Sequence, residues 1–248
     1  MSTSTVTRLE SMRAAGLVRR ASERVDEGVE QSLPVVAALR PLLPGGCLRR
    51  GSTITINANA PGVSAGGGAT SLLFAVLAEA SAAGSWCAVV GLPQLGLVAA
   101  AEAGVAVQRL ALVPRPGPDW VDAVGALLDG LDIIAVGTAG GGVAPGLASR
   151  IVARVRQRGA VLVAVGPWPG ADVALRITGA TWHGLGEGVG RLRRREVEVV
   201  VTGRGAAARA RRARLWLPGQ SGVPAPMAPA VTPLTIDRYH AQPERWAS

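Results

Sequence analysis

Five short apolar runs alternate with helix-like segments through the middle of this chain. The runs cover residues 52–56, 86–91, 109–113, 132–137 and 160–166. Helix-like segments follow the first four runs, at residues 70–83, 95–103, 119–130 and 144–158. Continuous apolar runs that alternate with helices are typical of a parallel sheet covered on both faces. The pattern therefore predicts an α/β fold with a parallel sheet flanked by helices.

The rhythm changes after Gly170, where strand-like stretches follow one another without room for helices between them. We expect an antiparallel strand extension over about 171–217, on one edge of the parallel sheet. Residues 1–46 read as an N-terminal helical extension, with helices over 6–28 and 32–46. Residues 47–217 then form the core with its extension. Residues 218–248 are rich in Pro and Ala without periodicity, and we expect a disordered tail there.

A glycine-rich loop follows the first apolar run and leads into the first helix. This strand, loop and helix layout is that of a phosphate-binding P-loop, in which backbone N–H groups and a lysine hold the phosphates. Ala69 occupies the lysine position, and all 26 cationic side chains of the chain are arginines, so no lysine can replace it. The residues that could still form a degenerate nucleotide site are Gly62, Gly66, Gly67, Gly68, Ala69, Thr70 and Ser71.

The carboxylates that a working P-loop enzyme needs are also missing from their expected places. A metal-positioning carboxylate would follow the run 132–137, but Gly137 and Thr138 stand there. A water-activating carboxylate would follow the run 86–91, but that stretch carries Pro93 and Gln94. Three missing groups in three places argue against phosphoryl transfer. We therefore expect no catalytic residues and no cofactor, with weak binding of ATP and magnesium as the alternative.

Cysteine and histidine usage excludes two further classes of protein. Cys47 and Cys87 are far apart in the sequence, which does not fit a disulfide scaffold. The two histidines, His183 and His240, have no paired cysteines, so a zinc site is not expected. The N-terminus has no apolar core of a secretory signal, and no apolar stretch reaches about 20 residues. These features favour a cytoplasmic protein without a membrane partner.

Most of the net charge of +9 lies in the segment 191–214. A basic strand-and-turn surface of this kind would attract a phosphate backbone without reading its sequence, or meet an acidic partner. A solvated strand face is the simpler interpretation, and the sequence leaves these alternatives open. The arginines concerned are Arg191, Arg193, Arg194, Arg195, Arg204, Arg209, Arg211, Arg212 and Arg214.

Apolar residues at both termini are candidates for partner binding. Leu17, Val18 and Val25 lie on one stripe of the expected N-terminal helix, and Trp246 lies in the tail. Such segments often fold on binding a partner. Packing of the N-terminal helix on its own domain remains an equal alternative.

The order of these parts resembles a RecA-type core over roughly residues 40–166. Within the RecA-like proteins, the sequence is most similar to the actinobacterial ImuA-prime mutagenesis factors over about residues 33–218. The phrases that carry this resemblance are "LLPGGCLRRGS", "SWCAVVGLP", "WPGAD", "VTGRGAAAR" and "RRARLWLP".

The resemblance implies an accessory role in the DNA-damage (SOS) response, within an error-prone translesion synthesis complex. The implied partners are an ImuB-like inactive homologue of Y-family polymerases and, through it, an error-prone replicative-type polymerase. DNA and a second copy of the chain are further candidate partners, and the implied location is the nucleoid. Two alternatives remain: a P-loop NTPase with degenerate motifs that binds or slowly hydrolyses ATP, with its missing cation supplied in trans by an arginine, for example across a subunit contact, and a simple basic DNA-binding module.

Overall fold

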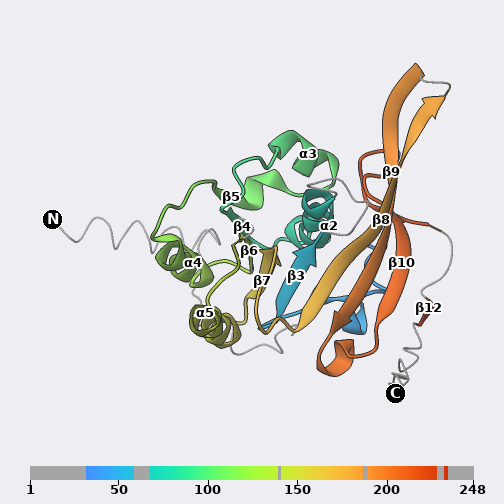
Figure 1. Ribbon diagram of the computed structural model, residues 1–248. Coiled ribbons are helices and arrows are strands. Elements are labelled where there is room, and N and C mark those ends of the chain that lie inside the picture. Colours follow the sequence, from blue (N-terminus) through green and yellow to red (C-terminus); the bar gives the residue numbers. More distant parts are fainter. Residues whose placement is uncertain (1–31, 59–67, 139–140, 187–188, 228–231, 234–248) are drawn as a thin grey trace, which may run out of the picture.

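The chain forms an α/β structure around one large mixed sheet (Figure 1). The computed structural model describes residues 32–58, 68–138, 141–186, 189–227 and 232–233. Across these residues the main sheet has the strand order β11-β10-β9-β8-β3-β7-β6-β4-β5, and β12 pairs with β10. A separate two-stranded sheet joins β1 (Ser32–Leu33) to β2 (Leu48–Arg49) in antiparallel register.

The parallel half of the sheet confirms the five strands expected from the apolar runs. Their side chains are mostly buried because helices cover both faces, and only the edge strand β5 is half-buried throughout. These strands are β3 (Thr53–Asn57), β4 (Cys87–Val90), β5 (Leu110–Val113), β6 (Ile133–Gly137) and β7 (Val161–Val165).

The helices confirm the four helix-like segments between those strands and divide between the two faces. Alternate strand residues pack into two clusters, one beneath α2 and α3 and the other beneath α4 and α5. Two short 3-10 turns, η2 (Pro44–Gly46) and η3 (Val107–Arg109), lie between elements. The four helices are α2 (Ala69–Ala82), α3 (Leu97–Glu102), α4 (Trp120–Leu128) and α5 (Pro145–Arg158).

The predicted extension is an antiparallel set of strands built on β3. Strand β8 (Val173–Gly186) runs parallel to β3, and β9 (Val189–Gly203) and β10 (Arg211–Trp216) then add in antiparallel register. The turn η4 (Gly205–Ala207) joins β9 to β10. The far end of the β8–β9 hairpin projects past the rest of the molecule (Figure 1).

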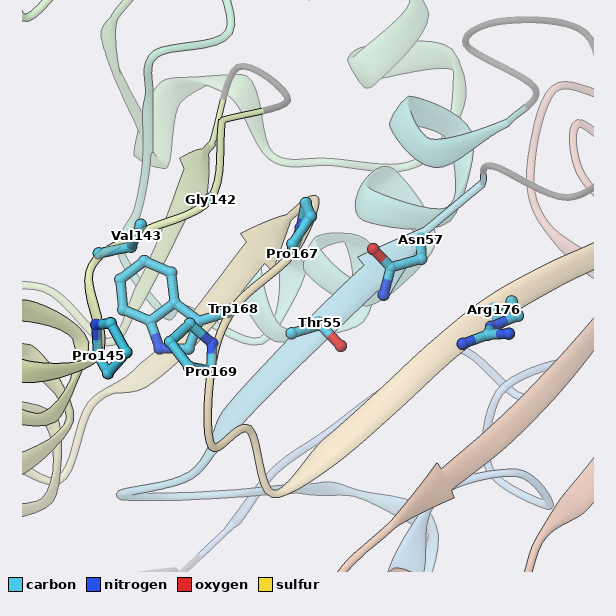
Figure 2. Close-up of a pocket in the computed structure, with 9 residues that line it drawn as sticks. All are labelled: Thr55, Asn57, Gly142, Val143, Pro145, Pro167, Trp168, Pro169 and Arg176. Carbon is cyan, nitrogen blue, oxygen red and sulfur yellow. The ribbon is translucent and has the colours of Figure 1, made fainter.

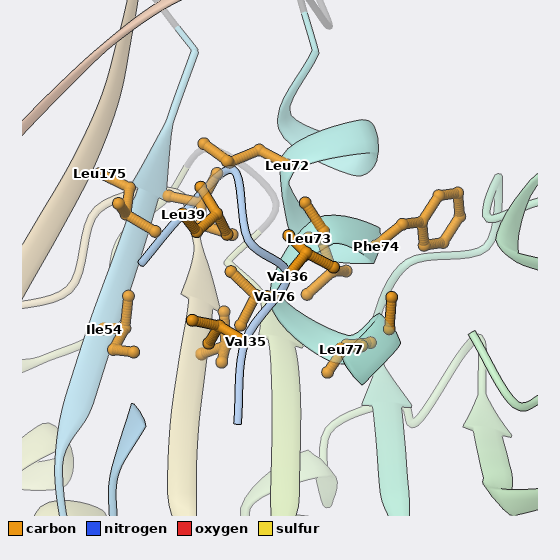
Figure 3. Close-up of a cluster of buried hydrophobic side chains, with 14 of the residues drawn as sticks. Val35, Val36, Leu39, Ile54, Leu72, Leu73, Phe74, Val76, Leu77 and Leu175 are labelled. Carbon is orange, nitrogen blue, oxygen red and sulfur yellow. The ribbon is translucent and has the colours of Figure 1, made fainter. Parts of the chain in front are cut away.

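The helix expected over 32–46 is wrong, because residues 37–42 form successive turns instead. Pro41 explains the difference, since it has no N–H to donate and its ring clashes with the preceding helical turn. The segment is still part of the core. Val35, Val36 and Leu39 pack beside α2, close to Ile54 of β3 (Figure 3).

The start of the expected tail also differs from the prediction. The backbone N–H of Leu217 donates to the carbonyl of Arg195, and Pro224 is buried. The strands β11 (Ala225–Pro226) and β12 (Thr232–Pro233) both pair with β10. The segment therefore continues the sheet along the outer edge of β10, where the N–H of Met227 donates to the carbonyl of Arg214.

Several expectations fall on parts of the chain that lie outside the described residues. These are the N-terminal helix over 6–28, the loop 59–67 and the end of the tail from 234. Across the described ranges, no helix is both long enough and apolar enough to span a membrane.

Candidate functional site

The N-terminus of α2 is where the P-loop motif places a nucleotide phosphate. Gly68 caps this helix with a φ of 109°, a conformation that favours glycine. A Cβ at this position would also lie 2.9 Å from the Cδ1 atom of Ile177. Ala69 and Ser71 are half-buried and Thr70 is exposed. The other glycines of the predicted site, Gly62, Gly66 and Gly67, lie outside the described residues.

Arg195 of β9 reaches the first turn of α2 and is buried, with 7% of its surface exposed. Its Nη2 donates to the hydroxyl of Ser71 at 3.2 Å, and its Nε donates to the carbonyl of Leu217 at 2.9 Å. The guanidinium also lies 5.0 Å from the centre of the Trp182 ring. Burial lowers the pKa of Arg195. A cation therefore stands beside the position where the P-loop lysine is missing.

This position of Arg195 corrects the sequence-based interpretation, which assigned it to a DNA or partner surface. The residue is 124 positions from Ser71 in the sequence. Only the register of β9 against β8, in which Arg195 lies opposite Trp182, brings it over α2. The sequence gives one signal that could have indicated burial: Arg195 shares strand parity with the buried residues Val197, Val199 and Val201.

The carboxyl ends of β4 and β6 have no acidic side chain, and their packing explains why. A Cβ on Gly137 would lie 2.5 Å from the carbonyl oxygen of Gly91 and 2.6 Å from the Cδ2 atom of Leu92. The two strand ends therefore touch through their backbones. Thr138 is turned back to the sheet, with its N–H donating to the carbonyl of Val165 at 3.2 Å. A carboxylate at position 137 would not fit without moving the backbone.

A cavity of about 630 Å³ opens at the carboxyl edge on the opposite face of β3 (Figure 2). Trp168 and three prolines form its apolar side, and Thr55, Asn57 and Arg176 form its polar side. The indole of Trp168 is buried, and its Nε1 has no hydrogen-bond partner in the part of the chain that the structure describes. The residues that line the cavity are Thr55, Asn57, Gly142, Val143, Pro145, Pro167, Trp168, Pro169 and Arg176.

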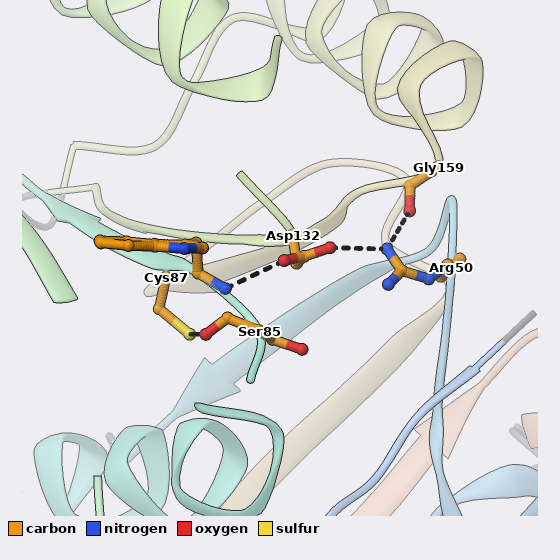
Figure 4. Close-up of polar contacts among 6 residues, drawn as sticks. Arg50, Ser85, Cys87, Asp132 and Gly159 are labelled. Carbon is orange, nitrogen blue, oxygen red and sulfur yellow. Dashed lines mark hydrogen bonds and ion pairs between the residues drawn. The ribbon is translucent and has the colours of Figure 1, made fainter. Parts of the chain in front are cut away.

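The amino edge of the sheet holds a dense set of polar contacts (Figure 4). Asp132, just before β6, accepts from Nη1 of Arg50 at 3.0 Å and from the backbone N–H of Trp86 at 2.9 Å. The same Arg50 nitrogen donates to the carbonyl of Gly159 at 3.3 Å. These contacts tie together the segments that precede β3, β4, β6 and β7. Asp132 thus lies at the strand start, as expected, far from the phosphate position.

The nine predicted basic residues differ in their surroundings. Five of them are engaged within the protein, and Arg195 is the buried example. Arg212 and Arg214 pair with Glu198 and Glu196, each at 3.5 Å. Arg211 donates to the carbonyl of Leu43 at 2.8 Å, and Arg204 donates to the carbonyl of Gly170. The remaining arginines are all exposed and make no ion pair with a described residue: Arg191, Arg193, Arg194 and Arg209.

Two other sequence-based expectations concern partners and metals. The candidate partner residues Leu17, Val18, Val25 and Trp246 lie outside the described residues. Within the described ranges, no group of three or more His, Cys, Asp or Glu residues is placed to hold a metal ion.

Comparison with known proteins places the parallel half of the molecule in a family. The family model described as the MT3502 N-terminal domain matches residues 41–170, which end just before β8. The chain is also 38% identical to the uncharacterized protein Rv3395c of Mycobacterium tuberculosis. That similarity extends over 160 residues, which are 62% of this chain and 78% of the mycobacterial protein.

Proposed function

The chain belongs to the MT3502 N-terminal domain family, and from this premise we propose that it is a non-catalytic adaptor with a RecA-like core. Its role is to join the proteins of an error-prone translesion synthesis complex that acts after DNA damage. The resemblance to ImuA-prime factors, set out from the sequence, supports this role. The partner that it implies is an ImuB-like inactive homologue of Y-family polymerases, and through it an error-prone replicative-type polymerase.

The single observation that carries the non-catalytic part of this proposal is the backbone contact between Gly91 and Gly137. Phosphoryl transfer needs groups that position magnesium and the attacking water beside the phosphates. In RecA-type enzymes those groups follow the strands that correspond to β4 and β6. Here the close approach of the two strand ends leaves no room for a side chain at Gly137.

A second candidate function, nucleotide binding without turnover, is favoured by the position of Arg195. Its guanidinium can present an N–H donor and a positive charge at the first turn of α2, close to Ser71. Helix N-termini also favour anions. Arg195 would then take the place of the missing lysine. This candidate differs from an enzyme, which would hydrolyse ATP, and from a loop that binds no nucleotide.

Calorimetric titration with Mg-ATP and with ADP, together with a DNA-stimulated hydrolysis assay, tests both candidates. The adaptor proposal expects no phosphate release with or without DNA. Hydrolysis that survives in Arg150→Met, an exposed arginine of α5, but is lost in Arg195→Met would contradict it. Binding heat without hydrolysis, lost only in Arg195→Met, would establish the second candidate.

Co-expression with the inactive Y-family polymerase homologue of the same organism tests the partner. We expect the two proteins to elute together in size-exclusion chromatography at micromolar concentration. We also expect deletion of the gene to lower the frequency of damage-induced mutations. Separate elution combined with an unchanged mutation frequency would refute the adaptor role.

A further inference from the structure

The outer part of the β8–β9 hairpin stands free of the body as a two-stranded ribbon. Strand β3 pairs with β8 only over Val173–Arg176, and β10 pairs with β9 only over Glu196–Val201. Beyond these residues the two strands pair with each other, and the ladder is irregular where residues 191–193 of β9 lie opposite Gly184 of β8 (Figure 1). At about 3.3 Å per residue, the free part is on the order of 20 Å long. We call this part, residues 183–186 and 189–194, the arm.

The arm carries three arginines within four residues of β9. Arg191, Arg193 and Arg194 are exposed, and none pairs with a described acidic residue. The two acids that follow on β9 are already engaged: Glu196 by Arg214, and Glu198 by Arg212. The one acid in the hairpin turn, Glu187, lies outside the described residues. The described part of the arm is therefore positively charged without compensation.

The arginines point to both faces of the ribbon. Side chains alternate along a strand, so Arg193 and Arg194 face opposite ways. Arg194 leans over the ring of Trp216, 4.3 Å from its centre, and Arg193 shares strand parity with Arg195 on the α2 side. A ribbon that is positive on both faces fits a groove with a phosphate backbone on each side. A flat acidic protein surface would meet only one of those faces.

The end of the arm also exposes large apolar side chains. Leu185 is 58% exposed and Leu192 is 47% exposed, and Gly190 lies opposite Leu185 in the ladder. Nucleic-acid-binding ribbons often place such side chains against base steps or base edges, while arginines contact the phosphates. Leu185 and Leu192 can thus contact the bases while the neighbouring arginines contact the phosphates.

We propose that the arm enters a groove of duplex DNA, with Arg191, Arg193 and Arg194 on the phosphates and Leu185 and Leu192 on the bases. The major groove of B-DNA, about 12 Å wide, admits a two-stranded β-ribbon. Contacts of this kind hold DNA largely without regard to its sequence. The inference does not rest on the adaptor role, because it follows from the geometry and charge of the hairpin alone.

Fluorescence anisotropy of the full chain with a labelled duplex of about 30 base pairs, between about 50 and 200 mM NaCl, tests the proposal. The test variant replaces Arg191, Arg193 and Arg194 by Ala. Its matched control replaces Arg49, Arg115 and Arg150 by Ala, which removes the same charge from exposed sites outside the arm that make no ion pair with a described residue. Each phosphate contact contributes about 0.9 to the slope of log affinity against log salt.

We expect the arm variant to bind at least about tenfold more weakly at low salt and to lose about 2 to 3 from that slope. The control variant should keep most of both. Equal losses in the two variants would overturn the proposal, because they would show that only net charge matters. The absence of wild-type binding at about 10 μM protein and low salt would overturn it as well.

A second pair of variants tests the leucines. Leu185→Ser with Leu192→Ser should weaken binding at every salt concentration without changing the slope, because no ionic contact is lost. Val98→Ser is the matched control, since Val98 is 74% exposed on α3. Binding that is unchanged in the leucine variant would remove the base contact from the proposal. Thermal denaturation of each variant shows that the fold is retained.

Discussion

The amino and carboxyl edges of the parallel sheet use their residues in opposite ways. At the amino edge, Asp132 and Arg50 join the starts of four strands through charged hydrogen bonds. At the carboxyl edge, Gly91 and Gly137 meet backbone to backbone and leave no room for a charged side chain. Ligands of open α/β sheets bind at the carboxyl ends of the strands. Here the charged hydrogen bonds that join the strands lie at the amino ends, which is the edge opposite the usual ligand position.

At the amino edge, the ion pair of Arg50 and Asp132 therefore serves to join the strands. At the carboxyl end, the charged groups come from the extension: Arg195 of β9 is buried there, and Arg176 of β8 lines the cavity. Substitutions at the two edges therefore separate what each edge does.

Breaking the amino edge should have the largest effect. Asp132→Ala removes the acceptor of Arg50 and of the Trp86 N–H, and it leaves a half-buried guanidinium without this carboxylate. Loss of one partner of a buried pair costs about 3–5 kcal/mol. We expect a loss of that order in the free energy of unfolding, measured by urea denaturation. Asp129→Ala is the control, because its ion pairs with Arg154 and Arg158 lie at the surface. A similar loss in both variants would contradict the difference between buried and surface pairs.

Removing the cation at the carboxyl edge should have an intermediate effect. Arg195→Ala deprives the Leu217 carbonyl and the Ser71 hydroxyl of a donor, which costs about 1–3 kcal/mol. Arg195→Met should cost less, because it keeps the packing against Trp182. Arg193→Ala, on the exposed part of the same strand, should leave the urea midpoint nearly unchanged. A loss in Arg193→Ala equal to that in Arg195→Ala would show that the burial of Arg195 does not matter.

The two cysteines should react at different rates. Burial, and secondarily the charge of Asp132, raises the pKa of the Cys87 thiol from 9.0 to about 12. Cys87 therefore stays protonated in the folded state, while Cys47 is half-buried. At about pH 8, we expect iodoacetamide to modify Cys47 at least about tenfold faster, as followed by mass spectrometry. Equal rates in the native protein would contradict the burial of Cys87.

The same thiol also affects stability at alkaline pH. Because its folded-state pKa lies above 9.0, Cys87 contributes its full stability below that pH. The contribution is lost as the pH rises from about 9 toward about 12, since only the unfolded chain ionises there. Cys87→Ser has no such thiol, so its stability should fall less over this range.

Restoring the missing lysine should have the smallest effect. Ala69→Lys returns the P-loop cation but leaves Gly137, Thr138 and Pro93 in place of the acidic groups. We expect no ATP turnover, and a change in unfolding free energy within about 0.5 kcal/mol because the site is partly exposed. Measurable phosphate release by this variant would show that the carboxyl edge needs no carboxylate.

The parallel half could be predicted from the sequence because its signals are local. The runs at 52–56 and 132–137 became β3 and β6 with a shift of about one residue at their ends. The prediction of a helix over 32–46 was wrong, because the apolar spacing is helical but Pro41 interrupts a helix there. Most apolar residues of this segment are buried all the same, so the pattern indicated burial correctly and conformation wrongly.

The candidate site was less predictable because it depends on distant pairings. The absence of a lysine and of carboxylates was visible in the sequence, but the contact between Gly91 and Gly137 was not. The arginines of 191–214 are predicted to form one charged surface, because a count of charges in the sequence cannot distinguish the buried Arg195 from the exposed Arg194. The register of β8 against β9, with its irregularities after Ile177 and His183, decides which side chain faces inward.

Over Glu196–Val201, strand β9 lies between β8 and β10, whereas in the arm it pairs with β8 alone. Its amide hydrogens should therefore exchange with solvent at very different rates within a single element. The amides over Glu196–Val201 lie inside the sheet and open only with large-scale unfolding, whereas those of the arm open through local fraying. The arm can thus loosen and re-form many times during the lifetime of a folded body. Strand β9 is therefore one continuous segment of backbone whose two parts open independently of each other.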